Sequence, residues 1–311
     1  MRNARKLYLQ RGLTGERWDL NGAGGVYAGD LAGLGVNFSP SFYDLGDGFF
    51  QVNDERKVPQ GSPGFTLRFT SSAYATYRQL VDWIAASPEL YLVYCPYGDM
   101  EFLRRIKLSY LSKGERNQLG WLEVPASVLA MTPWFRPVPA SIGMVVQTGT
   151  FKAYLWDEDE QDYGYRYTDD LVYPGDAEGV LSALLAPAGH IPAALVLRYH
   201  GAVEKPVLRL VGASTGKVYG ICALNAGVGV SLGATDTLEY STLQTDCHVR
   251  RISADGEETN LLPFVDLSQE DTSREIYFRL PVTESAVLSL ESPAAFSGEA
   301  ELTVYYFYGS V

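Results

Sequence analysis

Cysteine is the scarcest of the informative residues in this 311-residue sequence. Cys95, Cys222 and Cys247 make an odd number, and no two of them have the spacing of a CxxC or zinc motif. This usage argues against a disulfide framework and against a zinc site. We therefore expect a chain that folds in a cytoplasm without a structural metal.

Long apolar runs are lacking as well. No stretch approaches the roughly 18 consecutive apolar residues that a transmembrane helix requires. The N-terminal segment Met1–Lys6 is basic, but no apolar run follows it, and a signal peptide needs one. The sequence therefore predicts neither a signal peptide nor insertion into a membrane.

Positive charge is scarce in the second part of the chain. Residues 1–140 carry 15 Lys and Arg against 13 Asp and Glu, a net charge of +2, whereas residues 141–311 carry 10 against 24, a net charge of −14. Nucleic-acid binding depends on an excess of Lys and Arg, so we do not expect it. A nearly neutral part is suited to self-association, and an acidic part stays soluble.

The sequence contains several partial matches to catalytic and cofactor-binding motifs, and none of these matches is complete. The glycine-rich Gly22–Gly25 lacks the third glycine of a dinucleotide loop, because Tyr27 stands there. The segment Gly212–Lys217 is one residue short of a P-loop, and Val218 replaces the Ser or Thr that would meet magnesium. The same segment spells Gly-x-Ser-x-Gly around Ser214, but a strand follows where a nucleophile elbow needs a helix. We interpret both glycine-rich segments as turns or loops.

Metal ligands and histidines give no stronger signal. The acidic run Asp157–Asp162 lacks the glycine and the closing glutamate of an EF-hand, which favours a solvated hairpin tip and leaves a weak divalent-ion contact as the alternative. His248 follows Cys247, but neighbouring strand residues point to opposite faces, so the two cannot form a nucleophile pair. We expect no catalytic residue, no cofactor and no metal site, and hence no enzyme.

The first 140 residues predict an α+β domain with one helix on a mostly antiparallel sheet. The glycine-rich stretches Asn21–Gly25 and Gly29–Gly35 are interpreted as flexible or turn-rich loops. The strands that apolar alternation or continuous apolar runs predict are Lys6–Leu9, Phe49–Val52, Gly64–Phe69, Leu90–Tyr94, Glu101–Leu111 and Leu119–Thr132.

The predicted helix begins at Ser71 or Ser72, either of which can cap it through a side-chain oxygen, and ends before Pro88. Apolar residues recur along it at helical spacing. This predicted packing stripe consists of Tyr74, Tyr77, Leu80, Val81 and Ile84.

The prolines Pro133, Pro137 and Pro139, with Gly143, predict a linker near residue 140. We therefore divide the chain into an N-terminal domain of residues 1–140 and a C-terminal domain of residues 141–311. Beyond the linker, short strands separated by Gly, Asp or Ser turns predict a β-sandwich. The main strand candidates are Ala193–His200, Pro206–Gly212, Val218–Leu224, Thr237–Ser241, His248–Ile252, Glu275–Leu280, Ala286–Leu290 and Ala300–Tyr308.

Five aromatic residues gather within a short, presumed hairpin of the second domain. They are Tyr154, Trp156, Tyr163, Tyr165 and Tyr167. Core packing together with a protein interface is the favoured use of such residues. An exposed platform for sugar rings is the alternative, and either use makes these five residues a candidate glycan or partner contact.

Several short motifs follow one another in a recognisable order along both halves of the sequence. Those of the N-terminal half are Tyr74-x-x-Tyr77-x-x-Leu80-Val81-x-Trp83-Ile84, Leu90-x-Leu92-x-Tyr94-x-Pro96-x-Gly98 and Leu129-Ala130-Met131-Thr132-Pro133-Trp134. Those of the second half are Lys205-Pro206-Val207-Leu208, Gly216-Lys217-Val218-Tyr219-Gly220 and Phe278-Arg279-Leu280-Pro281. In this order they resemble the motifs of a known family, the distal tail proteins of long-tailed phages. The sequence departs from the family pattern at residues 21–35 and 157–162.

The resemblance implies a mainly β protein with a split-barrel-like N-terminal domain and a galectin-like, carbohydrate-module-like C-terminal β-sandwich. It implies a hexameric ring, closed through the N-terminal domains, that links the tail tube to the host-adsorption device of the virion. The implied partners are other copies of the chain, the tail tube protein, a tail hub or tail-associated protein and the receptor-binding proteins. DNA would pass through such a ring, and assembly would take place in the host bacterial cytoplasm. The alternative function is a carbohydrate-binding module for host cell-wall sugars.

Overall fold

The chain forms two compact units. Unit 1 comprises Met1–Arg136, Gly189–Ile191 and Tyr306–Val311, and unit 2 comprises Pro137–Ala188 and Pro192–Tyr305. In the computed structural model, the described residues are 5–35, 42–44, 49–51, 63–70, 72–98, 100–145, 150–151, 154–155, 166–167, 171–172, 180–267, 275–293, 296 and 298–310. Antiparallel strands dominate both units, so the prediction of a mainly β protein is confirmed.

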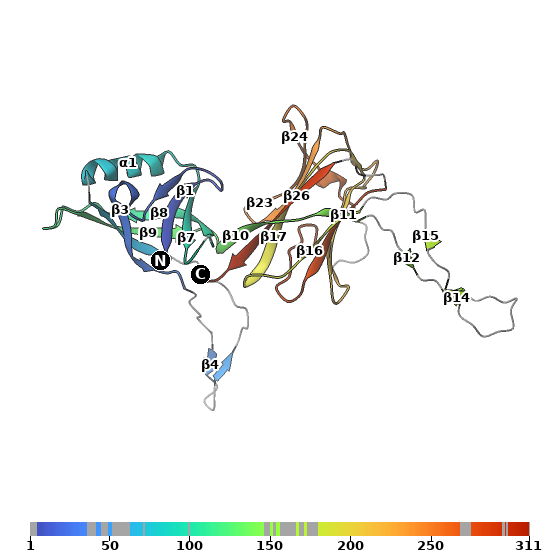
Figure 1. The fold of residues 1–311 in the computed structure, drawn as a ribbon, viewed down its shortest axis with the longest axis horizontal. Helices are drawn as coiled ribbons and strands as arrows, with labels where there is room; N and C mark the ends of the chain where they lie inside the picture. Colours follow the sequence, from blue (N-terminus) through green and yellow to red (C-terminus); the bar gives the residue numbers. More distant parts are fainter. Residues whose placement is uncertain are drawn as a thin grey trace. The chain divides into compact units, whose positions relative to one another are not determined.

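Unit 1 contains an antiparallel sheet in the order β2-β1-β7-β8-β9-β6-β3 (Figure 1). An isolated bridge between Asn21 and Tyr27 links the start of β3 to the end of β2, so the sheet nearly closes into a barrel. The strands are β1 (Lys6–Arg11), β2 (Arg17–Asp19), β3 (Val26–Ala32), β6 (Gly64–Phe69), β7 (Leu90–Cys95), β8 (Phe102–Leu111) and β9 (Leu122–Ala130).

Part of the stretch that was expected to be a glycine-rich loop is strand β3, preceded by the 3₁₀ turn η1 (Ala23–Gly25). Gly29 lies in this strand and pairs with Thr66 of β6. A Cβ atom at Gly29 would lie 2.8 Å from Nη1 of Arg68, which is the far end of a flexible side chain and can move aside. The strand is therefore defined by its pairing with β6, and the glycine does not mark a loop.

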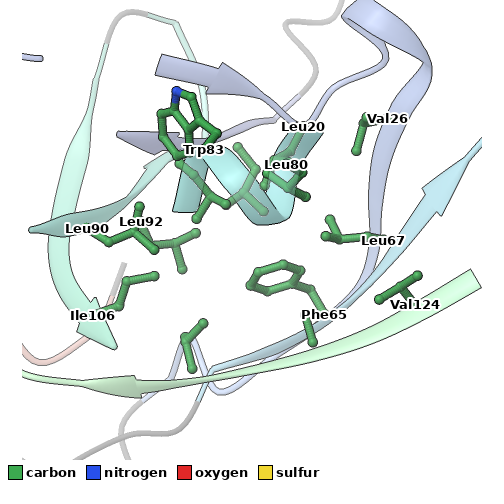
Figure 2. Close-up of a cluster of buried hydrophobic side chains, with 14 of the residues drawn as sticks. Leu20, Val26, Phe65, Leu67, Leu80, Trp83, Leu90, Leu92, Ile106 and Val124 are labelled. Atoms are coloured by element: carbon green, nitrogen blue, oxygen red, sulfur yellow. The ribbon is translucent and has the colours of Figure 1, made fainter. Parts of the chain in front are cut away.

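Helix α1 (Ala73–Ala85) covers the sheet of unit 1 and completes its core (Figures 1 and 2). In Figure 2, Leu80 and Trp83 of the helix meet apolar side chains from several strands, including Phe65, Leu67 and Leu92. The alternation that predicted Gly64–Phe69 as a strand also predicts which residues it buries, because successive strand residues point to opposite faces.

The start of α1 differs from the prediction. Ser72 occupies the N-cap position, but its side chain makes no capping hydrogen bond, and its φ of 46° lies in the left-handed region. The backbone oxygen of Ser72 instead accepts from the amide of Thr76 at 3.0 Å. Of the predicted packing stripe, Leu80 is fully buried, Tyr77 and Ile84 pack at the edge of the core, and Val81 is half-buried.

The predicted linker is a strand at its start. β10 (Trp134–Ala140) begins in unit 1, where Phe135 pairs with Leu103 of β8. Trp134 is fully buried, and the guanidinium of Arg104 lies 5.5 Å from the centre of its ring. Proline restricts the residue before it to extended backbone, so the prolines here favour a strand as readily as a linker.

The C-terminal end of the chain also belongs to unit 1. The amide of His190 donates to the carbonyl oxygen of Phe307 at 2.8 Å, and the amide of Gly309 donates to Nδ1 of His190 at 3.2 Å. The ring of Tyr308 packs edge-on against Phe102, with ring centres 5.0 Å apart. Unit 1 is therefore assembled from segments far apart in the sequence.

Unit 2 consists mainly of two five-stranded arrays, in the orders β26-β17-β22-β23-β24 and β11-β16-β25-β19-β20. The strands of the first are β17 (Ile191–His200), β22 (Thr237–Leu243), β23 (Asp246–Ile252), β24 (Glu258–Asn260) and β26 (Glu299–Tyr308). Those of the second are β11 (Gly143–Val145), β16 (Val180–Leu185), β19 (Val207–Gly212), β20 (Val218–Ala223) and β25 (Ala286–Glu291). Each pairs with its neighbours as the strands of a β-sandwich do.

Several shorter elements complete the described residues. These are β4 (Phe42–Asp44), β5 (Phe49–Gln51), β12 (Thr150–Phe151), β13 (Tyr154–Leu155), β14 (Arg166–Tyr167), β15 (Leu171–Val172), β18 (Val203–Glu204), β21 (Ser231–Leu232) and the 3₁₀ turn η2 (Leu262–Phe264). The predicted strand Glu275–Leu280 is wrong, since only isolated bridges occur at Glu275 and Leu280.

The segment Gly212–Lys217 is the tight turn of the β19–β20 hairpin, as predicted. The amide of Gly212 donates to the carbonyl oxygen of Lys217 at 2.8 Å, and Gly216 has a positive φ of 66°. Ser214 donates its hydroxyl to Glu284 at 2.6 Å and Thr215 does so at 2.8 Å. Ser214, which stands at the nucleophile position of the Gly-x-Ser-x-Gly motif, therefore connects the turn to the loop that precedes β25.

Replacing Leu80 by alanine tests the core of unit 1. We expect the free energy of unfolding to fall by about 2–5 kcal/mol, because the substitution removes apolar contacts and leaves a cavity. Leu184→Ala is the matched control, since Leu184 is 71% exposed and should change the free energy by no more than about 0.5 kcal/mol. Urea unfolding followed by tryptophan fluorescence measures both, and equal effects would contradict the assignment of Leu80 to the core.

Replacing Glu284 by glutamine tests the fastening of the turn. Hydrogen bonds from Ser214, Tyr219 and Thr215 lower the pKa of the Glu284 carboxyl to about 2, from an ordinary 4.5. A lowered folded-state pKa stabilises the fold above the unfolded-state value, and that stabilisation disappears as the pH falls toward 2. The wild type should thus exceed E284Q in stability at pH 6, by a difference that shrinks below pH 4.5 in urea titrations. A difference independent of pH would contradict this.

Candidate assembly surfaces

The hairpin between β8 and β9 ends in a tightly bonded turn. We call residues 113–121 the hairpin tip. The amide of Asn117 donates to the carbonyl oxygen of Trp121 at 2.8 Å, and the side-chain oxygen of Asn117 accepts from the amides of Leu119 and Trp121 at 3.0 Å each. Gly120 has a positive φ of 78° and donates its amide back to Asn117. The turn is therefore held in one conformation by its own hydrogen bonds.

This ordered turn presents apolar side chains to solvent. Leu119 is 71% exposed and Trp121 is 37% exposed. The hairpin extends beyond the strands and helix of unit 1 (Figure 1). A bonded turn that holds a leucine and a tryptophan in water has the character of a contact surface, because burying such groups is favourable.

The base of the tip is fastened to helix α1 by Tyr74. The hydroxyl of Tyr74 donates to Glu115 at 2.8 Å, which raises the pKa of the tyrosine, while Lys113 and Arg116 lie 4.6 and 4.9 Å from the centre of its ring. Tyr74 was expected in the packing stripe of the helix, yet it is 37% exposed. Its neighbour Ala73 is buried in its place, so the stripe is rotated by one residue at the start of α1.

A second apolar surface lies on the side of β8 and β9 that faces away from the core. We call it the outer face; its residues are Tyr110, Pro125, Leu129 and Met131, all exposed. The pairing shifts between Leu108 and Tyr110, where a bulge turns Tyr110 outward opposite Ser127. Leu129 lies beside Lys107, and the amide of Met131 donates to the carbonyl oxygen of Arg105.

Ion pairs border the outer face at both ends. At one end Arg68 lies between Asp30, at 2.9 Å, and Glu123, at 3.3 Å. At the other end Arg105 meets Glu89 at 2.7 Å. Because Arg68 and Arg105 have partners within the chain, covering the neighbouring surface would not strand either of these two charges.

The aromatic hairpin of unit 2 is described only in part. β13 and β14 are antiparallel, and their register places Tyr154 opposite Tyr167. Trp156, Tyr163, Tyr165 and the acidic run 157–162 lie outside the described residues. Contact of these residues with a glycan or a partner stays a prediction.

Unit 2 holds a charge network that the sequence reading missed. Glu239 on β22 is almost fully buried and bonds Arg198 at 3.2 Å, His248 at 3.0 Å and Arg250 at 3.1 Å. Burial opposes ionisation of Glu239, but the three partners outweigh it and the pKa of its carboxyl is lowered. Arg250 extends the network to Glu258 at 2.7 Å.

This network crosslinks four neighbouring strands, β17, β22, β23 and β24, on one face of their sheet. Opposite charges on directly paired strand residues stabilise a sheet in this way. The register pairs Glu239 with both Arg198 and Arg250, and such cross-strand partners cannot be read from one strand alone. The two arginines and the hydrogen bond with His248 explain how a carboxylate is tolerated in a buried position.

Neither a cluster of metal ligands nor a membrane-spanning helix occurs in the described part of the chain. There, no group of three or more His, Cys, Asp or Glu side chains is placed to hold a metal ion. No helix among the same residues is long and apolar enough to cross a membrane. Cys95 and Cys222 are buried free thiols, and Cys247 is an exposed one.

Similarity to known proteins appears in sequence and in fold. Residues 6–129 match the family model described as the distal tail protein, N-terminal domain. No curated protein matches the sequence significantly.

Two solved structures share the fold over almost the whole chain. A chain of the phage P2 baseplate in its activated conformation with Ca has 15% identity and a TM-score of 0.65, covering 99% of this chain and 100% of that one. The Dit protein of phage SPP1, described as a paradigm of the hub adsorption apparatus in phages that infect Gram-positive bacteria, has 10% identity and a TM-score of 0.55, covering 96% and 98%. Residues 6–129 thus match the distal tail protein N-terminal domain, and almost the whole chain shares its fold with these two phage baseplate and hub structures.

Proposed function

We propose that the protein is a non-enzymatic structural component of the virion that forms a hexameric ring at the tip of the phage tail. The ring joins the tail tube to the host-adsorption device, and each subunit contributes its N-terminal domain, residues 1–140, to ring closure. The C-terminal domain, residues 141–311, faces outward as a galectin-like β-sandwich. The observation that carries the proposal is the family match over residues 6–129.

Physical features of unit 1 support self-association. Residues 1–140 have a net charge of only +2, so copies of this part do not repel one another strongly. The hairpin tip and the outer face are two different apolar surfaces on the same unit. Contact between two different surfaces of identical subunits is heterologous, and repetition of such a contact closes into a ring when the rotation allows it.

The charge of the remaining chain supports the outward orientation. Residues 141–311 carry a net charge of −14, and six such parts repel one another least when they are held apart. The proposed neighbours are the tail tube protein, a tail hub or tail-associated protein and the receptor-binding proteins. The ring assembles in the host bacterial cytoplasm and lets DNA pass through its lumen without binding it.

Light scattering of the purified full chain tests the ring. We expect a single species of about six times the 34.2 kDa chain mass at micromolar concentration, because closed rings have a defined number of subunits. Negative-stain electron microscopy should then show six-fold symmetric particles. A strict monomer over this concentration range, alone and after mixing with the tail tube protein, would contradict the proposal.

A second candidate function is recognition of cell-wall sugars by the aromatic hairpin of unit 2. It is favoured by the register that pairs Tyr154 with Tyr167, since paired aromatic residues on a hairpin can offer a surface for sugar rings. We expect a glycan array to show binding by the full chain that Tyr154→Ala abolishes and Tyr97→Ala, at an exposed tyrosine of unit 1, leaves unchanged. Absence of binding to every wall polysaccharide would eliminate this candidate.

A further inference from the structure

Unit 1 exposes two dissimilar apolar surfaces, and we propose that they fit each other between copies. The hairpin tip of one copy, residues 113–121, docks on the outer face of the next copy, formed by Tyr110, Pro125, Leu129 and Met131. This inference rests on the proposed ring and names the surfaces that close it. In this contact, Leu119 and Trp121 are the apolar side chains that the hairpin tip contributes.

The tip has the properties of a preformed contact. Asn117 bonds the backbone of Leu119 and Trp121, and Gly120 closes the turn. Tyr74 fixes the base of the same hairpin to α1 through Glu115. A surface that is already ordered loses little conformational entropy on binding, so more of its apolar burial appears as affinity.

The outer face has the properties of a receiving surface. Tyr110, Pro125 and Leu129 project from two adjacent strands, and Met131 follows the end of β9. The four residues lie along one strip, with Ser127 and Lys107 beside them. Ion pairs border the strip at Arg68 and at Arg105, which resembles the apolar centre and polar rim of protein interfaces. Lys107 projects beside Leu129, and its long stem can pack under a ligand while the ammonium group stays in water.

The tip cannot cover the outer face of its own copy. The tip connects β8 and β9, and the outer face is one side of these same two strands. Folding back onto it would break the bridge between Arg116 and Leu122 and the bonds around Asn117. The tip of the same copy is thereby excluded, and the matched apolar character of the two surfaces, together with the net charge of only +2 on residues 1–140, favours the tip of a second copy.

A contact between the tip of one copy and the outer face of the next leads to a ring and not to a symmetric dimer. Two tips, or two outer faces, that met each other would form an isologous dimer and stop. A tip that meets an outer face leaves one of each surface free at the ends of every open oligomer. Growth therefore continues until the last tip reaches the first outer face.

Cross-linking of single-cysteine variants tests which surfaces meet. In a Cys247→Ser background, which removes the exposed native thiol, Leu119→Cys and Leu129→Cys are prepared separately and together as a co-assembled mixture. A short bis-maleimide should link dimers efficiently in the mixture and give only background with either variant alone. Cross-linking of Leu119→Cys alone at the level of the mixture, or no link in the mixture, would overturn the proposal.

Charge substitution on the tip provides an independent test. Leu119→Asp should weaken ring assembly about 30-fold in a dilution series followed by light scattering, the effect of losing a strong interface contact. Leu184→Asp is the matched control, because Leu184 of unit 2 is equally exposed, at 71%, and should leave assembly unchanged. Circular dichroism and the melting temperature should match the wild type for both variants, since neither residue is buried.

The outcomes separate this inference from the proposed function. A monomeric wild type would contradict both. A wild-type ring that Leu119→Asp leaves intact would overturn the docking of the tip while the ring itself stands. An intact Leu119→Asp ring that no longer binds another tail protein would assign the tip to that partner and would equally overturn the proposal.

Discussion

The register of β8 is the constraint on which unit 1 depends. One side of this ten-residue strand pairs with β7, while the other side pairs with β10 near Leu103 and with β9 from Ile106 onward. A slip of one residue would turn every side chain of the strand to the opposite face. Ile106 would leave the core, and the outer face would lose Tyr110. The bulge before Tyr110 therefore determines both what the unit buries and what it exposes.

The parts of the fold that could be predicted from the sequence are those with a local periodic signal. Strict alternation places the strand Gly64–Phe69 and its buried face, and α1 appears at the helical spacing of Tyr77, Leu80 and Ile84. The β-sandwich strands of unit 2 follow from short apolar runs between turns, such as the turn before Lys217. In each case the residues that define the element lie close together in the sequence, so the element can be recognised without knowing which distant residues it contacts.

The features that could not be predicted depend on residues distant in sequence. Tyr74 fits the helical stripe by spacing, but Glu115, 41 positions later, draws it to the surface. Gly29 suggests a loop until its pairing with Thr66 of β6 is known. Buried Glu239 owes its place to Arg198, and the two are 41 positions apart. The hairpin tip was missed for a different reason: the apolar residues from Leu119 onward predict a strand, and only the hydrogen bonds of Asn117 show that Leu119 and Trp121 lie in the turn before β9.

The uneven distribution of net charge along the chain limits which of its exposed apolar surfaces can associate. Apolar contacts are non-directional, so exposed leucine and tryptophan side chains invite unwanted association unless another force restricts it. The net charge of −14 on residues 141–311 opposes any packing that brings those parts together, and it acts over about 8 Å at physiological ionic strength. Contacts through residues 1–140, whose net charge is +2, meet no such opposition. This charge difference favours the proposed association through the part of the chain that carries the hairpin tip and the outer face, and the proposed closed ring would satisfy both surfaces in every copy.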